Sequence, residues 1–341
     1  MKAPTLGTTA PLLAVEQLSV GFPRRHGEAV TPVRGVSFSL DRGQRLGIVG
    51  ESGSGKSLTA LALMRLVHEP VALGGRVLLD GTDLLGLSAR EMARVRAQRM
   101  SLIYQDPMSA LNPVFSVGKQ IVEAVRLAHD VPAKAARSRA IALLDDVGVP
   151  EPARRIDSYP HEFSGGMRQR VMIAMALASD PDVLIADEPT TALDVTTQAR
   201  VMDLLSRIVA DRHLAVILIT HDLGVAAGFC DEVEVMYAGR VVEHAPVDDL
   251  YGRPVHPYTE ALLGAVCRLD ADTARPMPSI GGQPPLPDRL PTGCTFHPRC
   301  PCATQRCGGE TPVPLAVERG RFAECLYAHE RASAPSVGGG R

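Results

Sequence analysis

The chain has 341 residues, a formal net charge of −2 and 45% hydrophobic residues. This length is more than one simple core needs and is enough for one large domain plus an extension. The near-neutral charge shows no tail for binding polyanions, no apolar window reaches the roughly eighteen residues of a transmembrane helix, and the N-terminus lacks a signal-peptide pattern. We therefore expect a cytosolic protein with no nucleic-acid partner.

Apolar alternation and short apolar runs predict strands, and longer periodic runs predict helices. The predicted strands cover residues 12–20, 34–40, 45–49, 76–80, 100–104, 183–187, 215–220 and 232–239. Helical patterns cover residues 57–67, much of 117–180, 194–211 and 222–228. Strands alternating with helices predict an α/β fold with a mixed or parallel sheet core and an antiparallel β portion at the front.

Proline and glycine become dense after about residue 245, and residues 280–294 are too rich in both for regular structure. We therefore place a domain boundary near residues 250–255. The expected division is a disordered N-terminus at 1–12, a main domain at 13–252 with a helical subdomain at about 106–180, a Cys- and Pro-rich extension at 253–330, and a flexible tail at 331–341.

Residues 50–57 read GESGSGKS and lie between a predicted strand and a predicted helix. Gly50, Gly53 and Gly55 let the backbone wrap a phosphate chain with its N–H groups pointing inward. Lys56 is expected to reach the β- and γ-phosphates and the next residue, Ser57, to ligate Mg²⁺. The alternative is a glycine-rich turn without a ligand, which the preceding apolar strand makes the weaker interpretation.

The apolar stretch VLIADEP at residues 183–189 ends in two acids. Asp187 suits a carboxylate that supports Mg²⁺ through water, and Glu188 suits a general base that positions the attacking water. A strand that simply ends in solvent-facing acids is the ordinary alternative.

The stretch FSGGMRQR at residues 163–170 opens a helix with a Ser-Gly-Gly turn. It is a second helix N-terminus that could bind phosphate, although Ser164 as a plain N-cap is the simpler reading. Two such sites in one chain raise a question, because a nucleotide has only one γ-phosphate.

GESGSGKS, FSGGMRQR and VLIADEP, in this order along the chain, resemble the motifs of the ATP-binding subunit of ABC transporters over residues 12–250. The resemblance implies an ABC-type P-loop domain that pairs head to tail with a second one, so that the Ser-Gly-Gly helix of each contacts the ATP of the other. The residues that it places around ATP are Gly50, Ser52, Gly53, Ser54, Gly55, Lys56, Ser57 and Leu58 in the first motif, and Ser164, Gly165 and Gly166 in the helix.

The same resemblance implies further roles by position. Gln105 is similar to the residue that contacts Mg²⁺, together with Ser57 and Asp187, and senses the membrane subunits. His221 is similar to the switch histidine at the γ-phosphate, and Asp194 to a residue at the dimer seam. Phe22 is the candidate for stacking on adenine, with Phe38 as a rival.

Several stretches resemble one branch of the family, the importers of peptides and nickel. They are Met167 within FSGGMRQR, where the commoner signature has Gln, YQDPMSALNP at 104–113, HPYTEALL at 256–263, and IGGQPP followed by GCTFHPRC. The resemblance implies uptake of di- or oligopeptides, with nickel chelates, glutathione or another small solute as alternatives. It implies a related second ATPase subunit, two membrane permeases, a solute-binding protein outside, and a peripheral place on the cytoplasmic face of the membrane.

Four of the seven cysteines lie in residues 293–307, and Cys325 follows. Disulfides are disfavoured in a reducing cytosol, and free thiols without a role are the plain alternative. Zinc modules usually supply C-x2–4-C pairs, whereas the closest pair here, Cys300-x-Cys302, is too tight for that pattern. Loosely spaced thiolates suit a cuboidal cluster. The resemblance implies a [4Fe–4S] cluster on Cys294, Cys300, Cys307 and Cys325, with Cys302 outside it and His297 as the zinc alternative.

Three rival classes remain. A DNA-repair ABC ATPase would carry cysteines inside its core and two cores in one chain, an exporter ATPase would lack the extension, and a non-catalytic subunit would lack Glu188 and the intact motifs.

Overall fold

A computed structural model of the chain describes residues 10–24, 29–106, 110–191, 193–265, 280–318 and 320–333. The chain forms two compact units: Met1–Leu40, Leu46–Leu85 and Thr220–Arg341 make the first, and Asp41–Arg45 with Gly86–Ile219 make the second. Residues 1–9 of the predicted disordered N-terminus, residues 107–109, Cys267 and residues 334–341 of the predicted tail lie outside the described residues.

The first unit contains an antiparallel sheet, as the alternating sequence predicts. Its strands are β1 (Leu13–Phe22), β2 (Val30–Leu40), β4 (Ala72–Leu79) and β5 (Thr82–Asp83), in the order β2-β1-β4-β5. Leu13, Val15 and Leu18 of β1 are buried. β4 begins four residues before the predicted strand, because its glycines weaken the sequence pattern by which a strand is recognised. One of them, Gly75, has a φ of 89° and lies against a bulge at Gln17.

A second sheet in this unit starts from the strand that precedes the Gly-rich loop. β3 (Arg45–Val49) runs parallel to β9 (Glu232–Tyr237), which pairs antiparallel with β10 (Arg240–Pro246). β12 (Arg321–Ala323) and β11 (Leu315–Glu318) continue the ladder from β10. The C-terminal extension thus adds two strands to this sheet. Sequence analysis did not predict them, because three or four residues are too few to show a period.

The helices of the first unit are short. They are α1 (Lys56–Leu63), α9 (Leu223–Phe229), α10 (Val247–Gly252), α11 (Pro257–Gly264), α12 (Gln305–Gly309) and α13 (Ala328–Ser333), with the 3₁₀ helices η4 (His297–Arg299) and η1 (Leu84–Gly86), whose last residue belongs to the second unit. Residues 280–294 contain no helix or strand, which confirms that prediction.

A buried ion pair ties the extension to the sheet. The Glu243 carboxylate in β10 is 0% exposed and accepts hydrogen bonds from the N–H groups of Val255 and His256, each at 2.8 Å. Arg321 of β12 donates to the same carboxylate at 3.2 Å and to the main-chain oxygen of Arg253. The turn that begins the extension is therefore held by one carboxylate that takes three donors.

The second unit contains a parallel sheet of buried apolar strands. β6 (Met100–Ile103), β7 (Val183–Asp187) and β8 (Ala215–Thr220) pair in the order β8-β7-β6. Every residue of β7 and β8 is buried, as expected for strands covered on both faces. Because the strands are parallel, their carboxyl ends, where Gln105 and Asp187 stand, lie at one edge.

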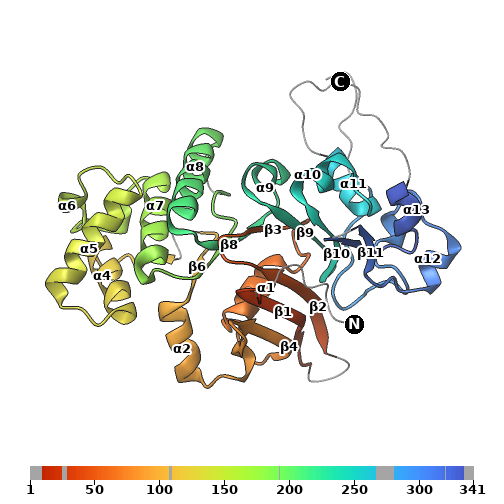
Figure 1. Cartoon of the computed structure of the whole chain (residues 1–341), viewed down its shortest axis with the longest axis horizontal. Coiled ribbons are helices and arrows are strands. Elements are labelled where there is room, and N and C mark those ends of the chain that lie inside the picture. Colours follow the sequence, from red (N-terminus) through yellow and green to blue (C-terminus); the bar gives the residue numbers. More distant parts are fainter. Residues whose placement is uncertain are drawn as a thin grey trace. The chain divides into compact units, whose positions relative to one another are not determined.

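Helices make up the rest of the second unit, as predicted for residues 117–180. They are α2 (Ala89–Gln98), α4 (Val117–Ala128), α5 (Ala133–Asp146), α6 (Pro152–Arg155), α7 (Gly165–Ala176) and α8 (Val195–Arg212), with the 3₁₀ helices η2 (Pro160–Glu162) and η3 (Leu177–Ser179). α4 packs on α5, α5 on α7, and α7 on α8 (Figure 1). Within the described residues, no helix has the length and apolar character to cross a bilayer.

Candidate functional site

The Gly-rich loop between β3 and α1 depends on glycine for its shape. Gly50, Gly53 and Gly55 have φ angles of 151°, 80° and 106°, values that side-chain-bearing residues rarely adopt. A Cβ at position 50 would lie 2.2 Å from the main-chain oxygen of Met236, so this backbone passes too close to β9 for any other residue. Ser52 and Gly53 are exposed at the tip of the loop.

Lys56 is the first residue of α1, and its side chain turns back into the loop. Its Nζ donates to the carbonyl oxygens of Gly50 at 2.7 Å and Glu51 at 3.0 Å. Ser54 Oγ is buried and finds no hydrogen-bond partner among the described residues, while Ser57 and Leu58 are half-buried in the first turn. The loop thus holds an ammonium group beside the N–H groups of a helix N-terminus, an arrangement that suits an anion.

In the second unit the structure brings Glu188 together with Gln105. Glu188 follows the buried Asp187 in a left-handed conformation, with φ of 47°, and its N–H donates to the oxygen of Ile219 at 2.8 Å. The Glu188 carboxylate accepts hydrogen bonds from Gln105 Nε2 at 2.9 Å and Thr191 Oγ1 at 2.8 Å. Two neutral donors therefore aim one carboxylate oxygen at the carboxyl edge of the sheet.

The Ser-Gly-Gly turn and Asp194 are also neighbours in the second unit. Ser164 caps α7 by accepting from the N–H of Met167, and Asp194 caps α8 by accepting from the N–H and the hydroxyl of Thr197. These hydrogen bonds from Thr197 lower the pKa of Asp194. A Cβ on Gly166 would lie 2.8 Å from the Thr197 methyl, so the two helix starts are in close contact and a larger residue at position 166 would force Thr197 to move. Gly165 is exposed beside them.

Two other predicted residues lie in the first unit. His221 is exposed after β8, next to Asp222, which caps α9. Phe22 ends β1 and is half-buried, whereas its rival Phe38 is only 7% exposed and packs in the core. Of these two candidates Phe22 is therefore the more accessible.

The cysteines of the extension are thiols in the structure. No disulfide joins cysteines of the described residues, and no three of the His, Cys, Asp and Glu side chains described are placed to hold one metal ion. Burial raises the pKa of Cys294 and Cys325 and raises that of Cys300 to about 11. Cys307 is an electrostatic neighbour of all three, and its carbonyl accepts the N–H of Cys294 at 2.8 Å. The thiols are therefore neighbours, but they do not form a ligand group.

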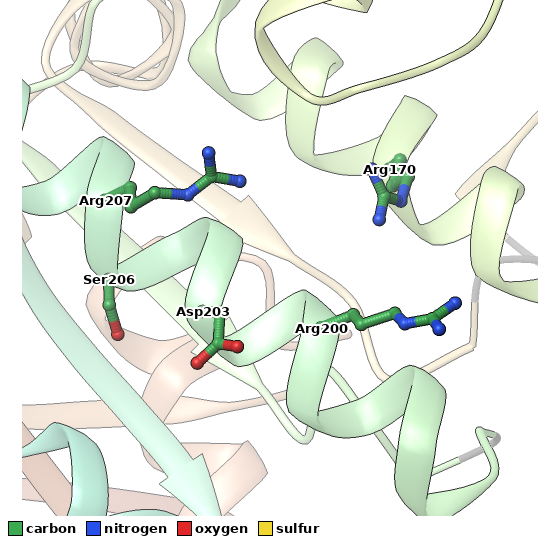
Figure 2. Close-up of a pocket in the computed structure, with 5 residues that line it drawn as sticks. All are labelled: Arg170, Arg200, Asp203, Ser206 and Arg207. Carbon is green, nitrogen blue, oxygen red and sulfur yellow. The ribbon is translucent and has the colours of Figure 1, made fainter.

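Helices α7 and α8 border a hollow of about 550 Å³ in the second unit. Figure 2 shows its lining residues, Arg170, Arg200, Asp203, Ser206 and Arg207. The guanidinium groups of Arg200 and Arg207 extend from α8 toward the side on which Arg170 lies. Arg170 donates to the main-chain oxygens of Val147 and Gly148. Of these residues only Arg170 belongs to a predicted nucleotide motif, as the last residue of FSGGMRQR.

Comparison with known proteins identifies the family. The ABC transporter family matches residues 33–191, and the oligopeptide/dipeptide transporter C-terminal region matches residues 242–307. The chain belongs to the ATP-binding subunits of ABC transporters. It is 49% identical to a putative peptide import ATP-binding protein of Brucella abortus over 93% of this chain and 95% of that protein. It is 50% identical to the oligopeptide transport ATP-binding protein OppD of Escherichia coli over 89% of each.

Solved structures support the fold of this ABC ATPase. A dimeric, post-hydrolysis structure of the ATP-binding cassette MJ0796 bound to ADP and Pi matches with a TM-score of 0.62 and 25% identity, covering 69% of this chain and 98% of that one. The cassette cbiO1 of Clostridium perfringens matches with a TM-score of 0.60 and 26% identity, covering 71% and 90%. The predicted ABC-type fold and ATPase class are therefore confirmed.

The sequence analysis of this ABC ATPase missed two sets of contacts. Thr191 beside Glu188 was not singled out, although a hydroxyl three residues after an acid at a strand end is a usual local partner. Glu51 was not singled out either, and its partners Tyr258 and Arg299 lie more than 200 residues away in the sequence. No spacing rule could have paired them.

Proposed function

We propose that this ABC ATPase hydrolyses ATP with Glu188 as the base that orients and deprotonates the attacking water. The observation that carries this role is the Glu188 carboxylate at the tip of a buried strand, aimed by Gln105 and Thr191. Lys56 supplies positive charge to the β- and γ-phosphates, and His221 contacts the γ-phosphate. Catalysis is then mainly positioning and charge stabilisation, as in phosphoryl transfer generally.

Magnesium fits the donor set that the sequence predicts. Ser57, Gln105 and Asp187 supply a hydroxyl, an amide and a carboxylate, which are the hard oxygen donors that Mg²⁺ prefers. The ion, when bound, would neutralise charge on the phosphates. These three residues would hold it, directly or through water, while Phe22 stacks on the adenine and the loop residues cradle the phosphates.

The Ser-Gly-Gly turn is proposed to serve the nucleotide of a second ATPase subunit. Ser164 and Gly165 are exposed at the start of a 12-residue helix, where N–H groups and the helix dipole favour an anion. Asp194, capping the next helix, would lie at the seam between the subunits. We propose a related but different chain as the partner.

The cargo is proposed to be di- or oligopeptides, taken up through two membrane permeases from an extracytoplasmic solute-binding protein. The match to the oligopeptide/dipeptide transporter region and the names of the relatives support this. The candidate surface for docking on the permeases is the segment 104–115, of which residues 107–109 lie outside the described part. Its apolar residues Tyr104, Val114 and Phe115 are 43%, 70% and 37% exposed. The ATPase would then sit on the cytoplasmic face of the membrane.

Two experiments test these assignments separately. Lys56→Ala should abolish nucleotide binding by the purified protein, and unchanged binding would contradict the role of the loop. Uptake of labelled di- and tripeptides, nickel and glutathione by cells with and without the gene would identify the cargo. Uptake of nickel or glutathione alone would replace the peptide proposal with that alternative.

We also propose that Cys294, Cys300, Cys307 and Cys325 hold a [4Fe–4S] cluster. The chemistry of four neighbouring thiols and the sequence resemblance support it, but the thiols do not form a ligand group in the structure. Burial holds the protons on Cys294, Cys300 and Cys325, and cluster binding would displace them. Iron and acid-labile sulfide near four per chain in anaerobically purified protein would support the cluster. Zinc without sulfide would replace it with a zinc module.

The domain division remains part of the proposal. It assigns residues 13–252 to the ATPase domain, 106–180 to its helical subdomain and 253–330 to the extension.

A further inference from the structure

Glu51 lies between the loop residues Gly50 and Ser52, and the C-terminal extension holds it from two sides. Its carboxylate receives two parallel hydrogen bonds from Arg299, with Nη1 to Oε2 at 2.7 Å and Nη2 to Oε1 at 2.9 Å. Its main-chain N–H donates to Tyr258 Oη at 2.8 Å. One loop residue is thus fixed through both its side chain and its backbone.

The Arg299 side chain is built into the extension. It is 4% exposed, and its Nε donates to the oxygen of Gly281 at 2.8 Å. Its guanidinium carbon lies 5.7 Å from the ring centroid of Tyr237 and 6.0 Å from that of Phe296. The hydrogen bonds to Glu51 raise the pKa of Arg299. A buried bidentate pair of this kind loses both geometry and charge compensation when either partner is removed.

Tyr258 is equally fixed, and the stretch His256-Pro257-Tyr258 explains how. The N–H of Tyr258 donates to His256 Nδ1 at 3.0 Å, which caps α11, and proline at the first helical position suits a helix start. The Tyr258 ring is 0% exposed and lies 4.6 Å from Tyr237 and 5.3 Å from Phe296, centroid to centroid. The phenol that meets Glu51 therefore has no freedom to move away.

These contacts continue to the lysine of the loop. The carbonyl oxygens of Gly50 and Glu51 accept hydrogen bonds from Lys56 Nζ, so the position of Glu51 contributes to the placement of the ammonium group. We propose that Arg299 and Tyr258 are positioning residues that hold the phosphate-binding loop in its nucleotide-ready shape, so that the C-terminal extension controls the affinity for ATP. The inference rests on the proposed role of this loop in binding the phosphates.

The physical reason is preorganisation. A loop of three glycines has large conformational freedom, and binding must otherwise supply the free energy of ordering it. The contacts of Arg299 and Tyr258 with Glu51, which we call the anchor, order the loop before the nucleotide arrives. Lys cannot replace Arg299 fully, because an ammonium group lacks the planar fork that matches a carboxylate.

The test compares three variants by equilibrium binding of a fluorescent ATP analogue to the full-length purified protein. Arg299→Met keeps the stem that packs on Tyr237 and Phe296, and leaves a carboxylate that is 24% exposed and can be hydrated. Tyr258→Phe removes only the acceptor for the Glu51 N–H. We expect the dissociation constant to rise about tenfold in Arg299→Met and a few-fold in Tyr258→Phe and Arg299→Lys.

Arg306→Met is the matched control. Arg306 pairs with Glu310 at 2.8 Å in the same extension, but both side chains are 52% exposed, and this variant should bind as the wild type does. In steady-state hydrolysis the anchor variants should raise KM for ATP more than they lower kcat, whereas general damage to the fold would lower kcat and the melting temperature together. The double variant Glu51→Gln/Arg299→Met should have nearly the same dissociation constant as whichever single variant binds less tightly, because both substitutions remove the same ion pair.

Wild-type affinity in both Arg299→Met and Tyr258→Phe would overturn the proposal. If Arg299→Met fails to fold, wild-type affinity in Tyr258→Phe alone overturns it, since that change removes a single oxygen. Lys56→Ala distinguishes the proposed role of the loop from this inference. Loss of binding in Lys56→Ala, with wild-type affinity in the variants of Arg299 and Tyr258, rejects the inference and leaves the role of the loop intact. Unchanged binding in Lys56→Ala rejects the role of the loop itself.

Discussion

Two loops of this ABC ATPase follow buried strands, and they are held in different ways. The phosphate-binding loop after β3 is fixed by close backbone approach at Gly50 and by Arg299 and Tyr258 from the extension. The turn after β7 is fixed by neighbours of its own unit, with Gln105 and Thr191 donating to Glu188. The first loop depends on partners distant in sequence, and the second mainly on partners at the same sheet edge.

The difference indicates which part of each loop must keep its position for the proposed function. In the proposed function the backbone N–H groups of the loop after β3 bind the phosphates, so the whole path of that backbone must be held. The turn after β7 is proposed to act through one carboxylate, so it is enough to orient that group. Changes to the second loop should therefore act on the rate of hydrolysis, and changes to the support of the first should act on stability and on nucleotide affinity.

Glu188→Gln should give the largest effect. The amide keeps the size of the side chain but cannot accept a proton, and a general base contributes roughly 10²- to 10⁴-fold to the rate. We expect kcat for ATP hydrolysis to fall by about that factor, with bound ATP retained, measured as phosphate release and as nucleotide co-purifying with the protein. Hydrolysis at the wild-type rate would assign the base to another residue.

Glu243→Gln tests the support of the first unit. The change leaves the Arg321 side chain, which is 2% exposed, without its carboxylate, and breaking a buried ion pair costs about 3–5 kcal/mol. The urea unfolding midpoint should fall clearly. Glu318→Gln is the matched control, because Glu318 and Arg253 are 44% and 48% exposed and pair at 3.3 Å; such surface pairs contribute about 0–1 kcal/mol. Equal midpoints for the two variants would contradict the anchoring role of Glu243.

The sequence predicted the helices and strands whose apolar residues recur at a regular spacing, and the motifs whose residues are contiguous. GESGSGKS and VLIADEP each carry their structural context with them, so the strand before and the turn after could both be read. The same holds for the apolar strands β7 and β8, whose uninterrupted burial matches their uninterrupted apolar sequence.

What the sequence could not predict depends on three-dimensional contact. Strands β11 and β12 have too few residues to show a period, and β4 is masked by its glycines. The contacts of Glu51 could not be predicted without knowing that Tyr258 of α11 and Arg299 of η4, more than 200 residues onward, return to the Gly-rich loop after β3. The HPY stretch was recognised as typical of a branch, but its physical role as a helix cap and tyrosine anchor became visible only from hydrogen bonds.

His256 should give the first unit a measurable pH dependence. Burial lowers the pKa of His256 to about 3, whereas an unfolded histidine titrates near 6.5. Between these values the unfolded chain binds a proton that the folded chain does not, so stability falls as the pH falls, by up to about 1.4 kcal/mol per pH unit.

The matched variant for this effect is His256→Asn, which keeps a cap acceptor for the N–H of Tyr258 but does not titrate in this range. It should be less stable at pH 7.5 because of the lost packing, yet its urea midpoint should fall less steeply between pH 6.5 and 5.5. Parallel pH profiles for the two proteins would show that another group carries the acid sensitivity.

Thr191→Val should give the smallest effect and the sharpest view of the turn after β7. Valine has nearly the shape of threonine but removes one of two hydrogen bonds to Glu188 Oε2, and one such bond is worth about 0.5–1.5 kcal/mol. The carboxylate then loses the donor that Thr191 supplies, so kcat should fall a few-fold while KM for ATP stays unchanged. Thr191→Ser keeps the hydroxyl and should restore the rate. A rise in KM without a fall in kcat would mean that this turn shapes nucleotide binding, and the contrast between the two loops would no longer hold.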